Sequence, residues 1–490
     1  MIHLSLIFCF MAVFLREPIA ASLGVAPLEP LHAALATLAG FAVLVLVVDL
    51  RVRMFARIVD ATGTWAAVYA AENTVRQGRL AAVALHVFNT TVLGWVEAVR
   101  TLTGDVILLD ELVMIAPLIV TWAAGWWSLE PVERRVREAA LIRSLDHGRP
   151  IHPPVTRWGF VLTNVRYHVL LLLIPMCLLL GWAETVERLA PRYLGIQAGS
   201  GWAIPLQLAG VVILFALMPM GLRLVWDTVP IGPGKLRESL TELCRRCGVR
   251  VGDLLLWRTH GLMLNGAVIG LFWPLRYILL TDALLETLPP EQVRAVAAHE
   301  VGHVRRRHLI WLGVTMVTTL MSLSLIAAIV QVPLAASGGV FASPLVEAAF
   351  AIAIILVAMT VMGFVSRRFE WQADAFAVVA LSRVELEGGQ SRSSPVVTPE
   401  AAATMQAALS AVAAASGIPL RKFTWRHGSI WTRQRRLAGL VGRPVSRLPI
   451  DREVRWLKLT ISLVALVVVA AVAGLYGLLQ LAAFVAGPQP

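Results

Sequence analysis

Long runs of uncharged, apolar residues constrain this chain more than any other feature of its sequence. A helix of about 20 apolar residues crosses a bilayer. The clearest runs of that length are Ala203 to Leu222, Leu309 to Val346, Ala348 to Ser366 and Thr460 to Gly487. Weaker runs are Pro30 to Val48, Leu80 to Val96, Leu112 to Ser128 and Val169 to Ala183. We therefore expect a mainly α-helical, polytopic membrane protein with seven to nine spans, and an uncleaved anchor in the first fifteen residues.

The net charge of +12 is carried mostly by arginines that lie between the apolar runs, in segments 129–166, 223–308 and 367–458. The positive-inside rule explains this placement better than nucleic-acid binding does, so we expect no nucleic-acid partner and place these segments in the cytoplasm. The excess of arginine over lysine is typical of a GC-rich bacterial genome, so we expect a bacterial inner membrane.

The pattern divides the chain into five parts. N-terminal spans and loops occupy 1–225, and a spanning helical hairpin occupies 309–366, between two cytoplasmic segments at 226–308 and 367–455. The last span is 456–490. Within 253–285, short β-prone runs separated by Gly and Pro predict a small sheet. A helix should follow, because the stretch that begins LPPEQ opens with Pro and carries a glutamate in its first turn.

That helix contains the sequence HEVGH, with His299, Glu300 and His303. A helix turns about 100° per residue, so two histidines four residues apart lie on one face and can bind the same metal ion. Glu300 projects to the side, where it can take a proton from a metal-bound water. Imidazole pairs of this kind hold the Zn²⁺ of many hydrolases, and we expect one zinc ion per chain.

The third ligand decides the class of site. A metzincin would need Gly at 306 and His at 309, but these positions hold Arg306 and Leu309. An intramembrane protease would place the motif within a span, whereas this motif lies in a polar helix. The hairpin at 309–366 should return the chain to the membrane face that it left, so Glu370 should arrive beside the histidines. Asp374, one turn later, can orient a ligand histidine.

Other residues near the motif have plainer interpretations. His308 lies five residues past His303, off the ligand face, and we expect it at the membrane interface beside Trp311. Arginines 305–307 should anchor the helix at the membrane surface. Cys244 and Cys247 form a lone CxxC without a second pair, which favours an ordinary helix face over a metal or redox site.

Four segments resemble the type I CAAX prenyl endopeptidase and HtpX-like family of integral-membrane zinc metallopeptidases (gluzincins): LNGAVIG, LLETLPPEQVRAVAAHEVGHVRRRH, RRFEWQADAFA and WRHGSIWTRQRRLAGL. The resemblance covers about 235–440. It implies zinc ligands His299, His303 and Glu370, the base Glu300 and the orienting Asp374. Two further sets are matched more loosely. Asn265, Ala267 and Gly270 correspond to an edge strand that binds the main chain of the substrate, although a simple Asn-Gly turn fits the sequence almost as well. His427 and Arg433 correspond to a pair near the zinc that can stabilise the oxyanion.

The expected function is that of a zinc-dependent endopeptidase embedded in the membrane. Its partners would be the lipid bilayer and peptides of hydrophobic, membrane-associated or prenylated proteins, which zinc-activated water would hydrolyse. The sequence leaves open a catalytically silent scaffold or sensor of the same fold, and a transporter with a fortuitous HExxH.

Overall fold

The computed structural model divides the chain into two compact units, Met1–Trp226 and Asp227–Pro490. It describes residues 5, 6, 8–10, 12, 13, 16, 24, 26–104, 106–146, 155–196, 202–261, 263–336, 344–387 and 396–486. The expected N-terminal anchor and the tight turn of the hairpin, at 337–343, fall largely or wholly outside these residues.

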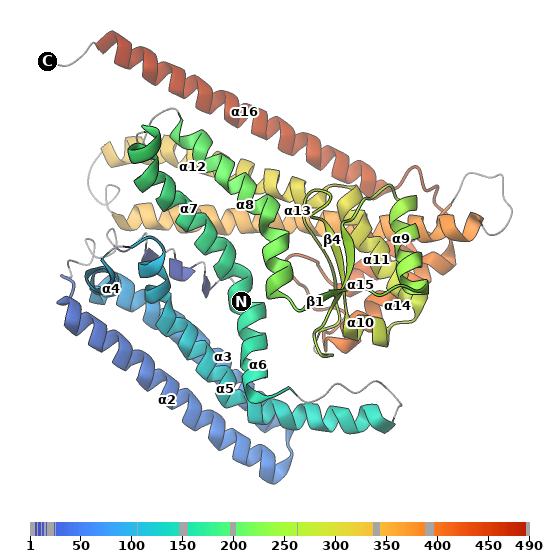
Figure 1. The fold of residues 1–490 in the computed structure, drawn as a ribbon. Helices are drawn as coiled ribbons and strands as arrows, with labels where there is room; N and C mark the ends of the chain where they lie inside the picture. The colour runs from blue at the N-terminus through green and yellow to red at the C-terminus, as the bar shows by residue number, and fades with distance from the viewer. Residues whose placement is uncertain are drawn as a thin grey trace. The chain divides into compact units, whose positions relative to one another are not determined.

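The first unit is helical throughout its described part (Figure 1). Its elements are α2 (Pro30–Thr62), α3 (Trp65–Phe88), the π-helical turn η1 (Asn89–Leu93), α4 (Trp95–Thr103), α5 (Leu109–Asp146), α6 (Arg157–Asn164), the π-helical turn η2 (Val165–Leu170), α7 (Leu171–Leu194) and α8 (Ala203–Val225). Helices α2, α3 and α5 pack against one another, and α7 packs against α8. Buried tryptophans and aliphatic residues fill the space between them.

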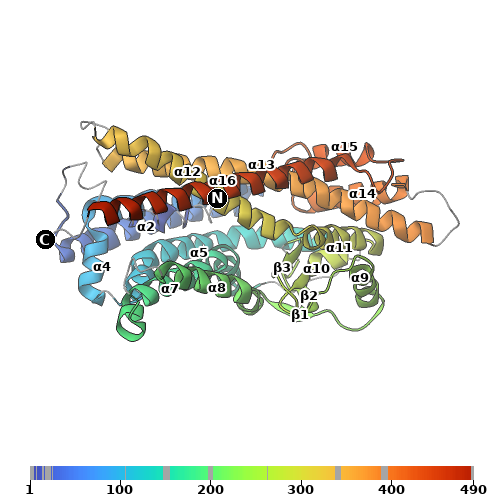
Figure 2. The same cartoon turned by 90° about the horizontal axis from the view of Figure 1, so that it is seen from above.

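The second unit joins a small sheet to helices. Its elements are β1 (Thr228–Pro230), α9 (Lys235–Arg246), β2 (Asp253–Trp257), β3 (Gly266–Ile269), β4 (Tyr277–Thr281), α10 (Asp282–Thr287), α11 (Pro290–Arg305), α12 (His308–Ala336), α13 (Pro344–Glu387), α14 (Pro399–Ala415), α15 (Ile430–Ala438) and α16 (Pro449–Ala486). Helices α12, α13 and α16 run side by side (Figures 1 and 2). The predicted sheet and the helix that follows it are both present.

The sheet has the strand order β1-β2-β4-β3. Strand β4 is buried along its whole length and pairs in parallel with β2 and antiparallel with β3, as expected for an apolar run at the centre of a sheet. Among the described residues, β3 pairs only with β4 and is therefore an edge strand. The main chain of its outer side is available to an added strand.

A buried carboxylate holds the loop that leads from β2 to β3. Asp282 accepts hydrogen bonds from the Thr259 amide and hydroxyl and from the His260 amide, at 2.9, 2.5 and 2.6 Å. Burial by itself would raise the pKa of Asp282, but these hydrogen bonds and one from the Ala283 amide outweigh it and lower the pKa. The folded state therefore stabilises the ionised form of Asp282.

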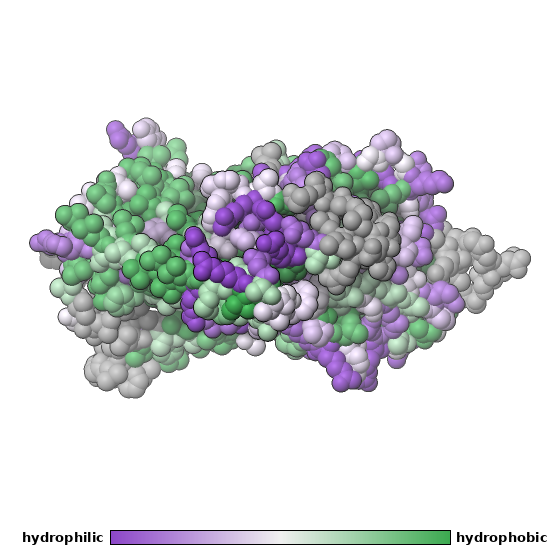
Figure 3. Space-filling model, turned by 90° about the horizontal axis from the view of Figure 1, so that it is seen from below, coloured by the Kyte–Doolittle hydropathy of each residue, from purple (hydrophilic) through white to green (hydrophobic). Residues whose placement is uncertain are grey.

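The spans agree with the sequence-based count. Seven described helices are long and apolar enough to cross a membrane: Pro30–Thr62, Leu109–Ala139, Arg157–Leu194, Pro205–Arg223, His308–Gln331, Ala349–Ser382 and Pro449–Leu475. An eighth candidate is the pair Trp65–Leu93 and Trp95–Thr103, bent by 77°. Broad areas of hydrophobic residues are visible on the surface in Figure 3. The chain is a multi-pass integral membrane protein.

Candidate metal centre

Helix α11 carries the HExxH motif and ends before the span that follows it. Pro289 and Pro290 start the helix and Glu291 lies in its first turn, where a negative charge favours the positive end of the helix dipole. The helix ends at Arg305, and Arg307 adopts a left-handed backbone with φ of 57°. The motif therefore lies in a helix of its own, as its polar sequence predicted.

A small residue allows α11 to approach α13 closely. A Cβ atom at Gly302 would lie 3.1 Å from Cδ1 of Phe376 and 3.3 Å from Cα of Ala373, both on α13. These distances are shorter than most carbon contacts, so a side chain at this position would require Phe376 or the α13 backbone to shift by a few tenths of an ångström. The contact brings the HExxH face of α11 next to Glu370 and Asp374, which lie one turn apart on α13.

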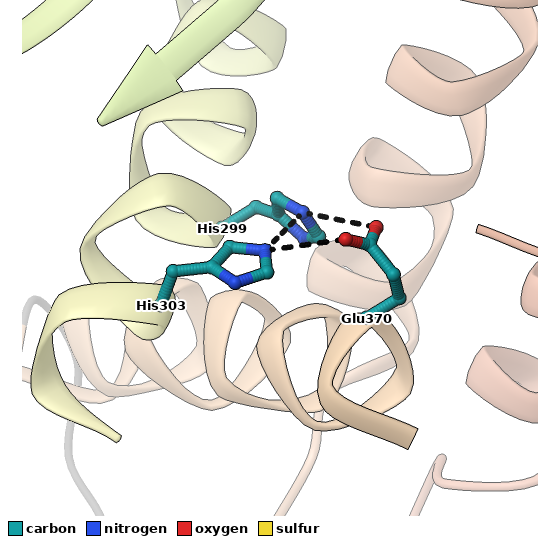
Figure 4. Close-up of side chains that lie close together, drawn as sticks. All are labelled: His299, His303 and Glu370. Carbon is teal, nitrogen blue, oxygen red and sulfur yellow. Dashed lines mark hydrogen bonds and ion pairs between the residues drawn. The ribbon is translucent and has the colours of Figure 1, made fainter. Parts of the chain in front are cut away.

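Three side chains from these two helices converge on one point (Figure 4). Nε2 of His299 lies 3.2 Å from Nε2 of His303, and the carboxylate oxygens of Glu370 lie 3.7 and 3.6 Å from these two nitrogens. A tetrahedral Zn²⁺ site with bonds of about 2.0–2.1 Å requires ligand atoms about 3.4 Å apart. Two imidazoles and one carboxylate at these separations fit such an ion without a change in the backbone. The described residues Arg367 and Arg368 bind elsewhere, to Trp425 and Glu453, so Glu370 is not part of a simple surface ion pair with them.

The second nitrogen of His299 faces a carboxylate that an arginine holds in place. Nδ1 of His299 lies 2.9 Å from Oδ1 of Asp374. Arg433, on α15, donates to both oxygens of Asp374, at 2.7 and 2.6 Å, and its Nη1 lies 3.4 Å from Glu370. A guanidinium that binds a carboxylate through two parallel hydrogen bonds fixes its orientation. The principal contact of Arg433 is therefore with Asp374.

The second nitrogen of His303 has a different partner, which the sequence did not reveal. Nδ1 of His308 lies 3.0 Å from Nδ1 of His303, and the His308 side chain is buried. The expectation that His308 lies off the ligand face assumed one continuous helix, in which it would point about 140° away. The break at Arg305 and the left-handed Arg307 turn the chain, so His308 comes back against His303.

Burial and neighbouring charges shift the pKa values of all three HExxH side chains on α11. Burial lowers the pKa of His303 to about 4, which leaves its imidazole neutral and able to bind a metal at pH 7. Burial also acts to lower the pKa of His299, but Asp374 and Glu370 outweigh it and raise that pKa. Burial raises the pKa of Glu300 above its usual range, which makes its carboxylate a stronger base.

The remaining predicted residues lie around this group. His427 Nδ1 is 3.1 Å from Oε2 of Glu370, and half of the His427 side chain is exposed. A Cβ at Gly266, the first residue of β3, would lie 3.5 Å from Cγ of Glu300, so the edge strand begins beside that side chain. Asn265 directly precedes the strand and Ala267 lies in it, while Gly270 follows it. At Gly270, φ is 92° and a Cβ would collide with the carbonyl oxygen of Leu275, so this turn requires glycine.

Comparison with known proteins gives the same picture. Residues 261–393 match the model of Peptidase family M48. The chain is 31% identical over 134 residues to a Protease HtpX homolog of Aeropyrum pernix, covering 26% of this chain and 39% of that protein. It is 26% identical over 197 residues to CAAX prenyl protease 1 of Saccharomyces cerevisiae, covering 35% of this chain and 42% of that protein. The chain thus spans about two fifths of the length of these curated relatives.

Among solved structures, the crystal structure of S. mikatae Ste24p is similar at a TM-score of 0.47 and 14% sequence identity, covering 85% of this chain and all of that one. The M48 match contains His299, Glu300, His303, Glu370 and Asp374. The family resemblance seen in the sequence is therefore confirmed: residues 261–393 match peptidase family M48, and the two relatives are named as proteases.

Proposed function

We propose that this protein is a membrane-embedded, zinc-dependent endopeptidase. The observation that carries the proposal is the convergence of His299, His303 and Glu370 at the separations of a tetrahedral metal site, with Glu300 on the same helix. The family match and the names of the two relatives, a protease homolog and a prenyl protease, support a peptidase. The donor set of two imidazoles and one carboxylate is typical of catalytic zinc, which keeps one position open for water or substrate.

Each residue of the site has a role in peptide hydrolysis. Zn²⁺, when bound, supplies a Lewis acid that lowers the pKa of water to about 7 and polarises the peptide carbonyl. Glu300, whose basicity is increased by burial, takes the proton of the attacking water and passes it to the leaving nitrogen. Glu300 thus returns to its ionised form at the end of the reaction, and the chain forms no covalent bond to the substrate. Asp374 holds the proton on Nδ1 of His299, which keeps Nε2 free for the metal.

His427 and Arg433 divide the task that the sequence assigned to them jointly. The half-exposed imidazole of His427 can reach the developing oxyanion of the substrate. Arg433 is buried and bound to Asp374, so it acts mainly by positioning Asp374 and Glu370. In this proposal His427 contacts the substrate directly and Arg433 acts through other residues.

The substrate would bind as an added strand along β3. The pairing of Asn265 with Thr281, at 3.1 Å, continues the β3–β4 ladder, so alternation places the main-chain groups of Gly266 and Val268 on the open side. An extended peptide could pair with these groups and pass Glu300. Asn265, which is exposed, could then bind the main chain at the entrance.

The position of the site favours membrane-associated substrates. The candidate span within α12 begins at His308, directly after the short turn that follows α11, so the metal centre lies at the end of a membrane helix. We infer that it cleaves hydrophobic, membrane-associated or prenylated proteins. The concentration of arginine around the site supports a cytoplasmic active site in a bacterial inner membrane.

The test compares cleavage of an unstructured protein substrate by purified wild type, Glu300→Gln and the matched control Glu291→Gln, which removes an exposed carboxylate from the same helix. Loss of a general base should reduce the rate by about 10²–10⁴-fold with zinc content unchanged, whereas the control should cleave like wild type. Equal cleavage by wild type and Glu300→Gln would reject the mechanism. Zinc binding without cleavage by wild type would favour a silent scaffold or sensor of this fold.

A further inference from the structure

The buried contacts of His303 continue beyond His308. Nε2 of His308 lies 2.9 Å from Oε1 of Gln372, and Nε2 of Gln372 donates to Oδ1 of Asp451 at 2.6 Å. Asp451 is in the first turn of α16, the C-terminal span. Side chains from four helices, α11, α12, α13 and α16, therefore form one continuous series.

The chemistry of the groups fixes the direction of every hydrogen bond in the series. An ionised carboxylate can only accept, so Gln372 presents its NH₂ group to Asp451 and its carbonyl oxygen to His308. His308 must then carry its proton on Nε2, which leaves Nδ1 as an acceptor. The proton between the two rings belongs to Nδ1 of His303, so its Nε2 has a free lone pair.

The surroundings hold this arrangement in place. The His308 ring stacks on Phe369, with centroids 4.5 Å apart and planes inclined by 4°, so the ring cannot turn freely. Both His308 and Gln372 are buried, with 1% and 4% of their surface exposed. Arg306 lies 3.2 Å from Asp451 and stabilises the charged carboxylate, and Lys458 of α16 donates to the Arg306 carbonyl at 2.8 Å.

We propose that His308, Gln372 and Asp451 form a positioning relay that holds the proton on Nδ1 of His303 and so prepares its Nε2 for the metal. Asp374 orients His299 in the same way, but directly, through its Oδ1 beside Nδ1 of His299. Asp451, which sets the direction of the hydrogen bonds in the relay, lies on α16. This span therefore contributes to the surroundings of the metal centre. The inference rests on the proposed zinc site, but it concerns how strongly zinc is held and does not depend on peptide cleavage.

The experiment measures zinc affinity by competition with a chelator, together with the absorption spectrum of the Co²⁺-substituted protein, using the full-length chain. His308→Phe keeps the stacked ring and removes the acceptor. Asp451→Asn keeps the shape but can present either end of its amide to Gln372. Glu453→Gln is the matched control, because it removes a carboxylate two residues away on α16 that contacts Arg368 and Arg436 and lies outside the relay.

Loss of a partner that orients a metal ligand lowers metal affinity by about 10–100-fold. We expect such a loss in His308→Phe and in Asp451→Asn, with an altered Co²⁺ spectrum, while Glu453→Gln retains the wild-type affinity and spectrum. The thermal midpoint of the metal-free protein is measured alongside. Asp451, at the edge of the site, provides the second variant if His308→Phe does not fold.

Wild-type zinc affinity and an unchanged Co²⁺ spectrum in both variants would overturn the relay while leaving the proposed function intact. A lower thermal midpoint of the metal-free protein alongside that result would show that the series only packs the helices together. Failure of wild type to bind zinc would instead reject the metal site itself.

Discussion

Among the described residues, Arg433 is the only arginine or lysine that contacts both Asp374 and Glu370, and its removal should be costly. Both carboxylates are buried, at 2% and 6% exposure, and Arg433 itself is 7% exposed. Arg433→Met preserves most of the volume but leaves two neighbouring carboxylates without their shared cation. Breaking a buried ion pair by removal of one partner costs about 3–5 kcal/mol. At about 1–2 °C per kcal/mol for a unit of this size, the thermal midpoint should fall by about 3–10 °C.

The assay is thermal unfolding of metal-free protein in detergent, with Arg435→Met as the matched control. Arg435 lies on the same helix, is exposed and contacts the Trp431 ring, so its loss should cost no more than about 1 kcal/mol. Saturating zinc should reduce the effect of Arg433→Met, because a cation beside Glu370 replaces part of the lost charge. A midpoint for metal-free Arg433→Met that is equal to that of Arg435→Met would refute the assignment of Arg433 as the residue that holds these carboxylates.

Three further changes test other parts of the account. Gly302→Ala should displace α13 slightly relative to α11 and lower zinc affinity, whereas Gly313→Ala, which has open space around it, should not; chelator competition measures both. Asp282→Asn should lower the free energy of unfolding by about 1–3 kcal/mol at pH 7. Because the folded pKa of Asp282 is depressed, its contribution is present above the unfolded pKa of about 3.9 and is lost as pH falls through the folded value, so wild type and variant should converge in acid. Val268→Pro should abolish cleavage while zinc binding is retained, because proline removes an outward N–H from the edge strand but no ladder hydrogen bond; loss of zinc or normal cleavage would contradict this.

Much of the architecture follows from the sequence because hydrophobic length and helical spacing are local properties. All eight apolar runs correspond to candidate spans, and HExxH forms a helix. Glu370 and Asp374 could be assigned by tracing the chain through two spans, since a hairpin must return to its starting side. The structure places both beside the histidines.

The parts that the sequence did not reveal depend on contacts between distant segments. The two hydrogen bonds from Arg433 to Asp374 join α15 to α13, whereas the sequence suggested that Arg433 lies near the zinc and stabilises the oxyanion together with His427. The predicted position of His308 was wrong because α11 ends at Arg305. The left-handed backbone of Arg307 then turns the chain, so that His308 faces His303. Asp451 gave no signal, because it lies far along the chain from His303, in a segment that the sequence assigned to the cytoplasm, whereas in the structure it lies in the first turn of α16.

The zinc content of the purified protein shows directly whether His299, His303 and Glu370 form a metal centre. We predict one zinc ion per chain in wild type and its loss in Glu370→Ala and His303→Ala, with Glu291→Gln as the control that keeps it. The absence of zinc from wild type after purification with zinc present, or one tightly bound zinc in Glu370→Ala, would contradict a metal centre formed by His299, His303 and Glu370.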